Sequence, residues 1–185
     1  NKDVITPNAN LIVQGIPDIP VSIKNDVLRY TESRFAGFAD WHPLKRNMII
    51  VTRFGNVPQL HLVKMPLGAR TQVTFYDDAV TNATYQPVNG NYFLFTKDVG
   101  GNEFAQIFRY DVANGNVIML TDGGRSQNGG MVWSKNGKWI AYESHESGKA
   151  EVYIKPFPGP GAKIQISSDG GVMPRWNKDG TRLFF

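Results

Sequence analysis

Short apolar runs, each about four residues long and bounded by turn residues, recur between polar segments along most of the chain. Runs this short, with many β-branched and aromatic side chains, are typical of buried β-strands. We interpret four of them as central strands that are buried on both faces: 48–51, 92–95, 139–142 and 182–185. No stretch shows a competing helical periodicity. The pattern therefore predicts an all-β fold.

One aromatic residue precedes each central run at a corresponding place. These anchors are Trp41, Tyr85, Trp133 and Trp176, which lie 44, 48 and 43 residues apart. A period of this length is typical of the four-stranded blades of a propeller. In three of the four copies, Asn-Gly or Asp-Gly lies between the anchor and the run, and these dipeptides favour tight turns between antiparallel strands. We predict that the four anchors pack between neighbouring blades, where a large ring fills the gap.

Each of the first three central runs is followed by two further strand patterns. The third strands are predicted at 59–63, 106–110 and 151–154. More polar outer strands are predicted at 71–74, 116–121 and 163–167. A polar outer strand is expected because the fourth strand of a blade is an exposed edge that must resist pairing with other chains.

The fourth copy contains two strand patterns, so its two outer strands must come from elsewhere. The N-terminal region offers 26–31 as the outer strand and 11–13 as the third strand. We therefore predict a small β-propeller, one domain over residues 1–185, with about four four-stranded antiparallel blades. The last blade would be closed by strands from both termini. The expected blades are 35–75, 80–121, 129–168, and a composite of 170–185 with 9–31.

The same pattern leaves two assemblies open. A closed four-bladed monomer is the first, and we favour it slightly. Alternatively, two chains exchange their termini and form one eight-bladed homodimer.

Composition and charge exclude several classes of protein. The net charge is +4, but Lys and Arg are spread thinly along the chain, which indicates a mildly basic, solvated surface rather than a nucleic-acid footprint. No apolar run approaches the length of a membrane span. The chain has no Cys, which excludes a disulfide scaffold and Cys-based zinc sites. We expect no nucleic-acid partner and no membrane.

The sequence contains no recognisable catalytic apparatus. A Gly-x-Ser-x-Gly elbow is absent, and the run Ser144–Glu146 brings triad residue types together only as loop neighbours. The three histidines (His42, His61 and His145) fall in different copies and show no metal-ligand spacing. The Asp-Gly-Gly links at 122–124 and 169–171 lack the Lys and the helix of a phosphate-binding loop. We expect no enzyme activity, no metal and no cofactor.

Particular stretches resemble a known superfamily of propellers. The segment Trp-Ser-Lys-Asn-Gly-Lys-Trp-Ile-Ala-Tyr at 133–142 resembles the motif of TolB-like (PD40, WD40-like) repeats. Residues 9–143, especially 29–32 and 97–103, resemble the propeller domain of prolyl-oligopeptidase-type (S9) serine peptidases. The stretches 151–161 and 168–171 instead resemble TolB-like repeats attached to bacterial kinases and regulators. The change near 144–148 suggests the hypothesis of a recombined or engineered chimera.

The resemblance implies a propeller fold and leaves three hypotheses for function. The first is a non-catalytic scaffold or binding module for a protein or peptide ligand at the channel mouth. The second is a detached substrate-gating propeller of an S9 peptidase, whose triad lies in a separate α/β-hydrolase domain that this sequence does not contain. The third is a TolB-like interaction module of the cell envelope, and a periplasmic or secreted location follows from either resemblance. The predicted mouth residues are Arg34, Asn82, Arg125, Gln127 and Met173.

Overall fold

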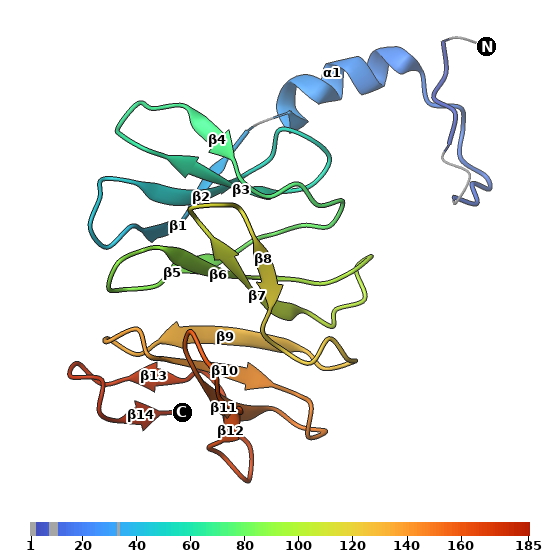
Figure 1. The fold of residues 1–185 in the computed structure, drawn as a ribbon. Coiled ribbons are helices and arrows are strands. Elements are labelled where there is room, and N and C mark those ends of the chain that lie inside the picture. Colours follow the sequence, from blue (N-terminus) through green and yellow to red (C-terminus); the bar gives the residue numbers. More distant parts are fainter. Residues whose placement is uncertain (1–2, 8–10, 33) are drawn as a thin grey trace. The chain divides into compact units, whose positions relative to one another are not determined.

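Tight turns between short apolar runs fold most of the chain into antiparallel sheets (Figure 1). The computed structural model describes residues 3–7, 11–32 and 34–185. The chain divides into two units, residues 1–35 and residues 36–185, which are described separately. The predicted single domain over residues 1–185 stays a prediction.

Three sheets of four strands follow one another along the chain, and each has its strands in sequence order. The first sheet consists of β1 (Ala36–Trp41), β2 (Met48–Thr52), β3 (Gln59–Val63) and β4 (Arg70–Gln72). The second sheet consists of β5 (Ala83–Tyr85), β6 (Tyr92–Lys97), β7 (Gln106–Asp111) and β8 (Val117–Met119). The third sheet consists of β9 (Asn128–Trp133), β10 (Trp139–Ser144), β11 (Glu151–Pro156) and β12 (Ile164–Gln165). The predicted all-β architecture of antiparallel blades is confirmed for residues 36–185.

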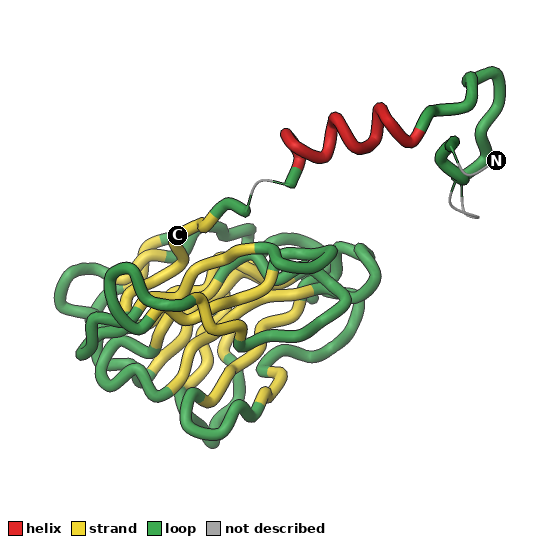
Figure 2. Tube along the Cα trace, turned by 90° about the horizontal axis from the view of Figure 1, so that it is seen from above, coloured by secondary structure: helices red, strands yellow, loops and turns green. Residues whose placement is uncertain are grey.

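The fourth sheet holds two strands, β13 (Arg175–Trp176) and β14 (Leu183–Phe184). Within residues 36–185 the sheets lie in an open row, which Figure 2 shows along a second direction. The predicted closed ring is therefore wrong. Its composite fourth blade required strands from residues 9–31, and the described part of that region forms none.

A helix replaces the predicted outer strand of the N-terminal region. Residues Val21–Thr31 form α1, which follows Pro20, a residue in extended conformation. Ile23, Val27 and Tyr30 lie at i, i+4 and i+7, the spacing of one helical face. The predicted third strand at 11–13 is likewise absent from the structure. The expectation that no helical periodicity competes with strands was wrong at this segment.

The hydrophobic core lies between successive sheets. Ile49 and Leu60 of the first sheet are buried together with Phe93 and Phe95 of the second. A second cluster joins the second and third sheets, and its buried members are Leu94, Ile107, Ile140, Tyr142, Tyr153 and Phe157. Side chains alternate between the two faces of a strand, so the central strands supply apolar groups to both neighbours.

A repeated hydrogen bond ties each outer strand to the third strand. A hydroxyl oxygen that follows the outer strand accepts a backbone N–H of the third strand in each of the three complete sheets. The pairs are Thr74 with Leu60 at 2.9 Å, Thr121 with Ile107 at 3.0 Å and Ser167 with Val152 at 2.8 Å. The first residue of the same third strand is Gln59, Gln106 or Glu151, and each is buried.

Candidate functional site

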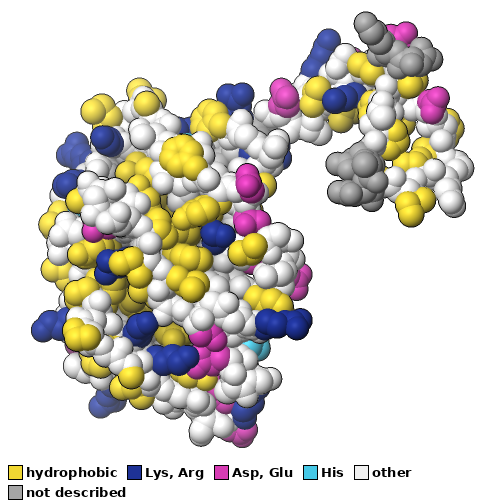
Figure 3. Space-filling model, turned by 45° about the vertical axis from the view of Figure 1, so that its right-hand side comes forward, with side chains coloured by type: hydrophobic (Ala, Val, Ile, Leu, Met, Phe, Trp, Pro, Cys, Tyr) yellow, Lys and Arg dark blue, Asp and Glu magenta, His cyan; other side chains and the backbone are white. Residues whose placement is uncertain are grey.

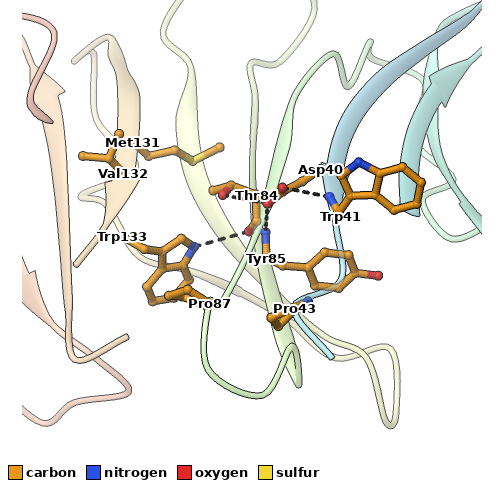
Figure 4. A pocket seen from close by; sticks show the side chains of 9 residues that line it. All are labelled: Asp40, Trp41, Pro43, Thr84, Tyr85, Pro87, Met131, Val132 and Trp133. Atoms are coloured by element: carbon orange, nitrogen blue, oxygen red, sulfur yellow. Dashed lines mark hydrogen bonds between the residues drawn. The ribbon is translucent and has the colours of Figure 1, made fainter. Parts of the chain in front are cut away.

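A pocket of about 380 Å³ opens where the innermost strands of three sheets end (Figure 4). β1, β5 and β9 each contribute their last residues, and the turns after β1 and β5 each contribute a proline. The lining residues are Asp40, Trp41, Pro43, Thr84, Tyr85, Pro87, Met131, Val132 and Trp133. Most of the lining is apolar, and the strand ends that carry it are held in sheets.

Asp40 joins the first sheet to the second inside this pocket. Its Oδ2 accepts the backbone N–H of Tyr85 at 2.8 Å and the hydroxyl of Thr84 at 3.1 Å, while its Oδ1 accepts the N–H of Trp41 at 2.8 Å. Both carboxylate oxygens are therefore engaged in holding the strands. Burial, and after it the charge of Asp40, raises the pKa of Tyr85 to about 12, so its phenol stays protonated at neutral pH.

The four anchors occupy different environments. Tyr85 is 3% exposed and lies between the first and second sheets. The Trp133 indole N–H donates a hydrogen bond of 3.4 Å to the carbonyl oxygen of Thr84 in the preceding sheet. The indole also packs edge-on against the Phe157 ring, and the two ring centres are 4.7 Å apart. Both arrangements correspond to the packing predicted from the repeat.

Trp41 departs from that prediction. Its side chain is 55% exposed, and its indole points away from Trp133 and Thr84 (Figure 4). No sheet precedes the first one among the described residues, so no blade covers this ring. Trp176 of the fourth sheet is half-buried, and its indole nitrogen is buried without a hydrogen-bond partner.

Four of the five predicted mouth residues lie at the opposite end of the inner strands, where the chain enters a sheet: Asn82, Arg125, Gln127 and Met173. Asn82 Oδ1 accepts the backbone N–H and the hydroxyl of Thr96 at 3.0 and 2.8 Å. The Arg125 guanidinium lies over the Phe104 ring, 5.3 Å from its centre. Both side chains thus make local contacts with residues of the second sheet and its loops. Arg34 belongs to residues 1–35, the unit described separately.

Gln127 and Met173 come closest to forming a site together. Gln127 lines a cavity of about 220 Å³ with Glu143 and His145, and the backbone N–H of Met173 donates to Glu143 Oε1 at 2.5 Å. The structure therefore brings two of the five predicted residues to one place. That Gln127 and Met173 bind a ligand stays a prediction.

The three histidines lie apart from one another. Within residues 3–7, 11–32 and 34–185 no group of His, Cys, Asp and Glu is placed to hold a metal ion. Burial, and after it the charge of Lys45, lowers the pKa of His42, whose Nδ1 accepts the backbone N–H of Leu44 at 3.1 Å. Burial and the charge of Arg70 lower the pKa of His61, whose Nε2 is buried without a hydrogen-bond partner.

Sequence reasoning missed the residues that give the pocket its apolar walls. Pro43 and Pro87 each lie two residues after an anchor, and Met131 lies two residues before one. The recurrence of proline at the same step after two anchors was the available signal. This recurrence indicates a rigid rim, but only the stacking of three sheets brings both prolines and Trp133 into the lining of one pocket.

Surface charge on residues 36–185 is mixed. On the face drawn in Figure 3, Lys and Arg side chains are scattered among acidic and hydrophobic ones. Among the residues that the structure describes, no helix is long and apolar enough to cross a membrane.

Successive antiparallel sheets that stack face to face are typical of the blades of a β-propeller, and residues 36–185 form an open row of such sheets. Among solved structures, the chain is similar to TolB from Acinetobacter baumannii, with 24% identity and a TM-score of 0.59 over 80% of this chain and 37% of that one. A putative TolB from Agrobacterium tumefaciens gives 19% identity and a TM-score of 0.55 over 69% of this chain and 45% of that one.

A prolyl endopeptidase structure is also similar, with 13% identity and a TM-score of 0.56 over 72% of this chain and 21% of that one. The chain thus spans less than half the length of each of these proteins. At these identities the similarity shows the fold alone. No protein-family model and no curated protein sequence matches the chain.

Proposed function

We propose that this chain is a non-catalytic binding module, and that the pocket at the ends of β1, β5 and β9 binds a short peptide segment of a partner protein. The observation that carries this proposal is the pocket itself, about 380 Å³ in volume and built by three different sheets. Its volume and its mostly apolar lining are those of ligand sites in general. Strand ends give it the fixed geometry that recognition requires.

The chemistry of the lining favours a peptide with apolar or proline residues. Pro43, Pro87 and the Trp133 indole offer flat surfaces on which such side chains stack. Asp40 is the carboxylate of the lining, and its oxygens already accept three hydrogen bonds from the protein. This engagement supports binding rather than acid–base catalysis.

A pocket-filling variant tests the proposal. The 185-residue chain is titrated with a pool of proline- and aromatic-containing peptides, and binding is followed by NMR chemical-shift changes. Pro87→Trp fills the pocket and is expected to weaken binding about tenfold or more, because it occupies the volume the ligand needs. Val99→Trp is the matched control, since Val99 is exposed on the loop after β6 and lines no part of the pocket. Shifts that map elsewhere, or equal affinities for both variants, contradict the proposal.

The non-catalytic part has its own test. The chain is incubated with chromogenic peptide and ester substrates, and no turnover above background is expected. Turnover that a serine-directed inhibitor abolishes would refute this part.

A detached substrate-gating propeller is the second candidate function, supported by the structural similarity to a prolyl endopeptidase. Such a domain would restrict access through its channel without requiring this pocket, so its interaction with peptides would not change in Pro87→Trp.

The similarity to TolB supports a third proposal, an interaction module located in the periplasm or outside the cell, which fractionation of the native source tests.

A further inference from the structure

A second cavity lies where the chain enters the third sheet, at the start of β9. Its volume is about 220 Å³, and its lining comes from the link before β7, the start of β9, and the end of β10 with the residue that follows. The lining residues are Ala105, Gln127, Asn128, Gly129, Glu143 and His145. The second and third sheets, which contribute them, each have a neighbouring sheet on both sides within residues 36–185. The cavity is therefore built inside the row of sheets.

Asn128 contributes a buried acceptor without a partner to this lining. The residue is 3% exposed, and its Nδ2 donates to the carbonyl oxygens of Ala105 and Ser126 at 3.0 and 3.1 Å. A carbonyl oxygen only accepts hydrogen bonds, so these contacts determine which end of the amide is the nitrogen. The Oδ1 atom is then buried with no hydrogen-bond partner among the residues that the structure describes. Such an acceptor costs free energy, and a ligand that supplies a donor recovers that cost.

Glu143 brings a carboxylate to the same cavity without a cation beside it. Its Oε1 accepts the backbone N–H of Met173 at 2.5 Å, which leaves Oε2 without a hydrogen bond from the described part of the chain. The ion pairs between described residues do not include Glu143. The six lining residues include no Lys or Arg. The cavity therefore carries a negative charge that the protein itself does not pair.

Two glycines make room beside this carboxylate. A Cβ at Gly130 would lie 2.5 Å from Glu143 Oε1, so a larger residue there would displace the carboxylate. Gly129 is the cross-strand partner of Glu143, and residues paired across two strands point to the same face. A Cβ at Gly129 would meet no atom within 4 Å, so there is open space on that face. The Gly-Gly pair at 129–130 thus keeps the carboxylate accessible.

We propose that this cavity binds a primary ammonium group, either the amino terminus of a peptide or the side chain of a lysine. The acceptors that the cavity offers are Asn128 Oδ1, Glu143 Oε2 and the His145 ring. His145 Nδ1 lies 3.4 Å from the Gln127 carbonyl oxygen, and because a carbonyl cannot donate, Nδ1 carries the proton and Nε2 of the neutral ring accepts. An ammonium group has three N–H donors and one positive charge. It therefore matches the lining in the number of hydrogen bonds and in the sign of charge.

Other cations fit this lining less well. Among the described residues no group of three His, Cys, Asp or Glu is placed to hold a metal ion, and Glu143 and His145 are the two such residues that line the cavity. Metal sites in proteins ordinarily take more ligands than these two. A guanidinium binds best when both oxygens of a carboxylate accept from it, and Glu143 Oε1 is already engaged by Met173. The single available oxygen favours the ammonium group.

This site goes beyond the proposed function. It shares no lining residue with the pocket beside Trp133, so binding at one place can fail without failure at the other.

Small probes test which group enters the cavity. The 185-residue chain is titrated with alanyl-alanine amide, which has a free α-amine, and with N-acetyl-lysine amide, which has a free ε-amine. At least one of them is expected to give saturable NMR shifts at Asn128 and Gly129, and the stronger binder identifies a peptide terminus or a lysine as the source. The two amines after acetylation, and N-acetyl-arginine amide, are expected to bind at least tenfold more weakly. Saturable shifts from neither amine, or equal binding by an acetylated or arginine probe, overturn the proposal.

Removal of the charge tests the role of the carboxylate. Glu143→Gln keeps an oxygen for the Met173 N–H, and it is expected to weaken binding of the preferred amine about tenfold because the charge is lost. Glu103→Gln is the matched control, since Glu103 is exposed on the loop after β6 and lines no part of the cavity. It is expected to bind the amine like the unaltered chain. Equal affinities of the two variants contradict the proposal.

Filling the cavity is the second test. Gly129→Val places a side chain in the open space and is expected to abolish amine binding, with an unchanged midpoint of thermal unfolding because the new Cβ meets no atom within 4 Å. Gly55→Val is the matched control, since a Cβ at Gly55 also meets no atom within 4 Å and Gly55 lies outside the cavity. Amine binding that survives in Gly129→Val overturns the proposal, whatever the result with Glu143→Gln.

Discussion

At the scale of single residues, buried polar side chains hold the links between sheets. The side-chain amide of Gln106 donates to the carbonyl oxygens of Phe104, Gly124 and Ser126 at 2.9 to 3.2 Å. Its Oε1 accepts the hydroxyl of Thr121 at 2.7 Å. One side chain thus satisfies several backbone groups of the link that leads to the third sheet. The sequence offers little sign of this role beyond a polar residue at the start of an apolar strand.

Gln106→Leu is expected to lower the free energy of unfolding by about 3 kcal/mol, because it leaves buried carbonyls and a hydroxyl without partners. Gln165→Leu is the control, since Gln165 is exposed and water can replace its partners. Urea unfolding followed by tryptophan fluorescence measures both. Equal losses in the two variants would show that the network does not stabilise the link.

His42 gives the molecule a sensitivity to acid. Its Nδ1 accepts the Leu44 N–H, and its ring lies 5.0 Å from Tyr85, so protonation costs an acceptor and brings charge into a buried place. The pKa of His42 is lower in the folded chain than in the unfolded one, where it is about 6.5. The unfolded chain therefore binds more protons, and stability falls as the pH drops below about 6.5.

His42→Gln is expected to reduce this loss. Gln86 occupies the corresponding turn position of the second sheet, and its Oε1 accepts the backbone N–H groups of Val88 and Asn89 at 3.0 and 2.8 Å. The substitution thus keeps an acceptor and removes a titrating group. Urea midpoints at pH 7.5 and pH 5 measure the difference. An unchanged pH dependence would assign the acid sensitivity to other groups, among them His61.

At the scale of elements, the innermost strands determine how one sheet meets the next. Asp40 is the clearest case, because a single carboxylate on β1 holds the backbone of β5. Asp40→Ala is expected to destabilise the chain by about 2 kcal/mol, and Asp40→Asn by less, since the amide keeps one acceptor oxygen. Thermal unfolding measures both, with the exposed Asp77→Ala as control. Equal midpoints for Asp40→Ala and Asp77→Ala would contradict this role.

The strands predicted from apolar runs agree with the structure where a tight turn lies on each side of the run. The central runs at 48–51, 92–95 and 139–142 lie inside β2, β6 and β10, because an apolar run between tight turns has few other ways to bury both faces. The distance of the segment 26–31 from Trp41 matches the repeat and so predicts a strand. Its spacing of apolar residues fits a helix equally well, and the structure forms α1 there.

At the scale of the whole molecule, the sheets of residues 36–185 stack in an open row, and both outer faces of that row carry exposed aromatic side chains. The first sheet presents Phe38 and Trp41, and the fourth presents Arg175 and Phe184. Exposed aromatic patches on a folded chain commonly mark interaction surfaces.

The repeat written in the sequence determined the strand order, the antiparallel blades and the anchors, because periodic apolar runs and turn dipeptides act over short distances along the chain. Only the tertiary structure decided the rest. The pocket requires Pro43, Pro87 and Trp133, which come from three sheets, to line one space. Trp41 has the same local sequence context as Tyr85, but no sheet precedes it among the residues that the structure describes, and its side chain is 55% exposed. Whether an aromatic side chain is buried depends on which sheet stacks against it, and that contact joins residues more than forty positions apart.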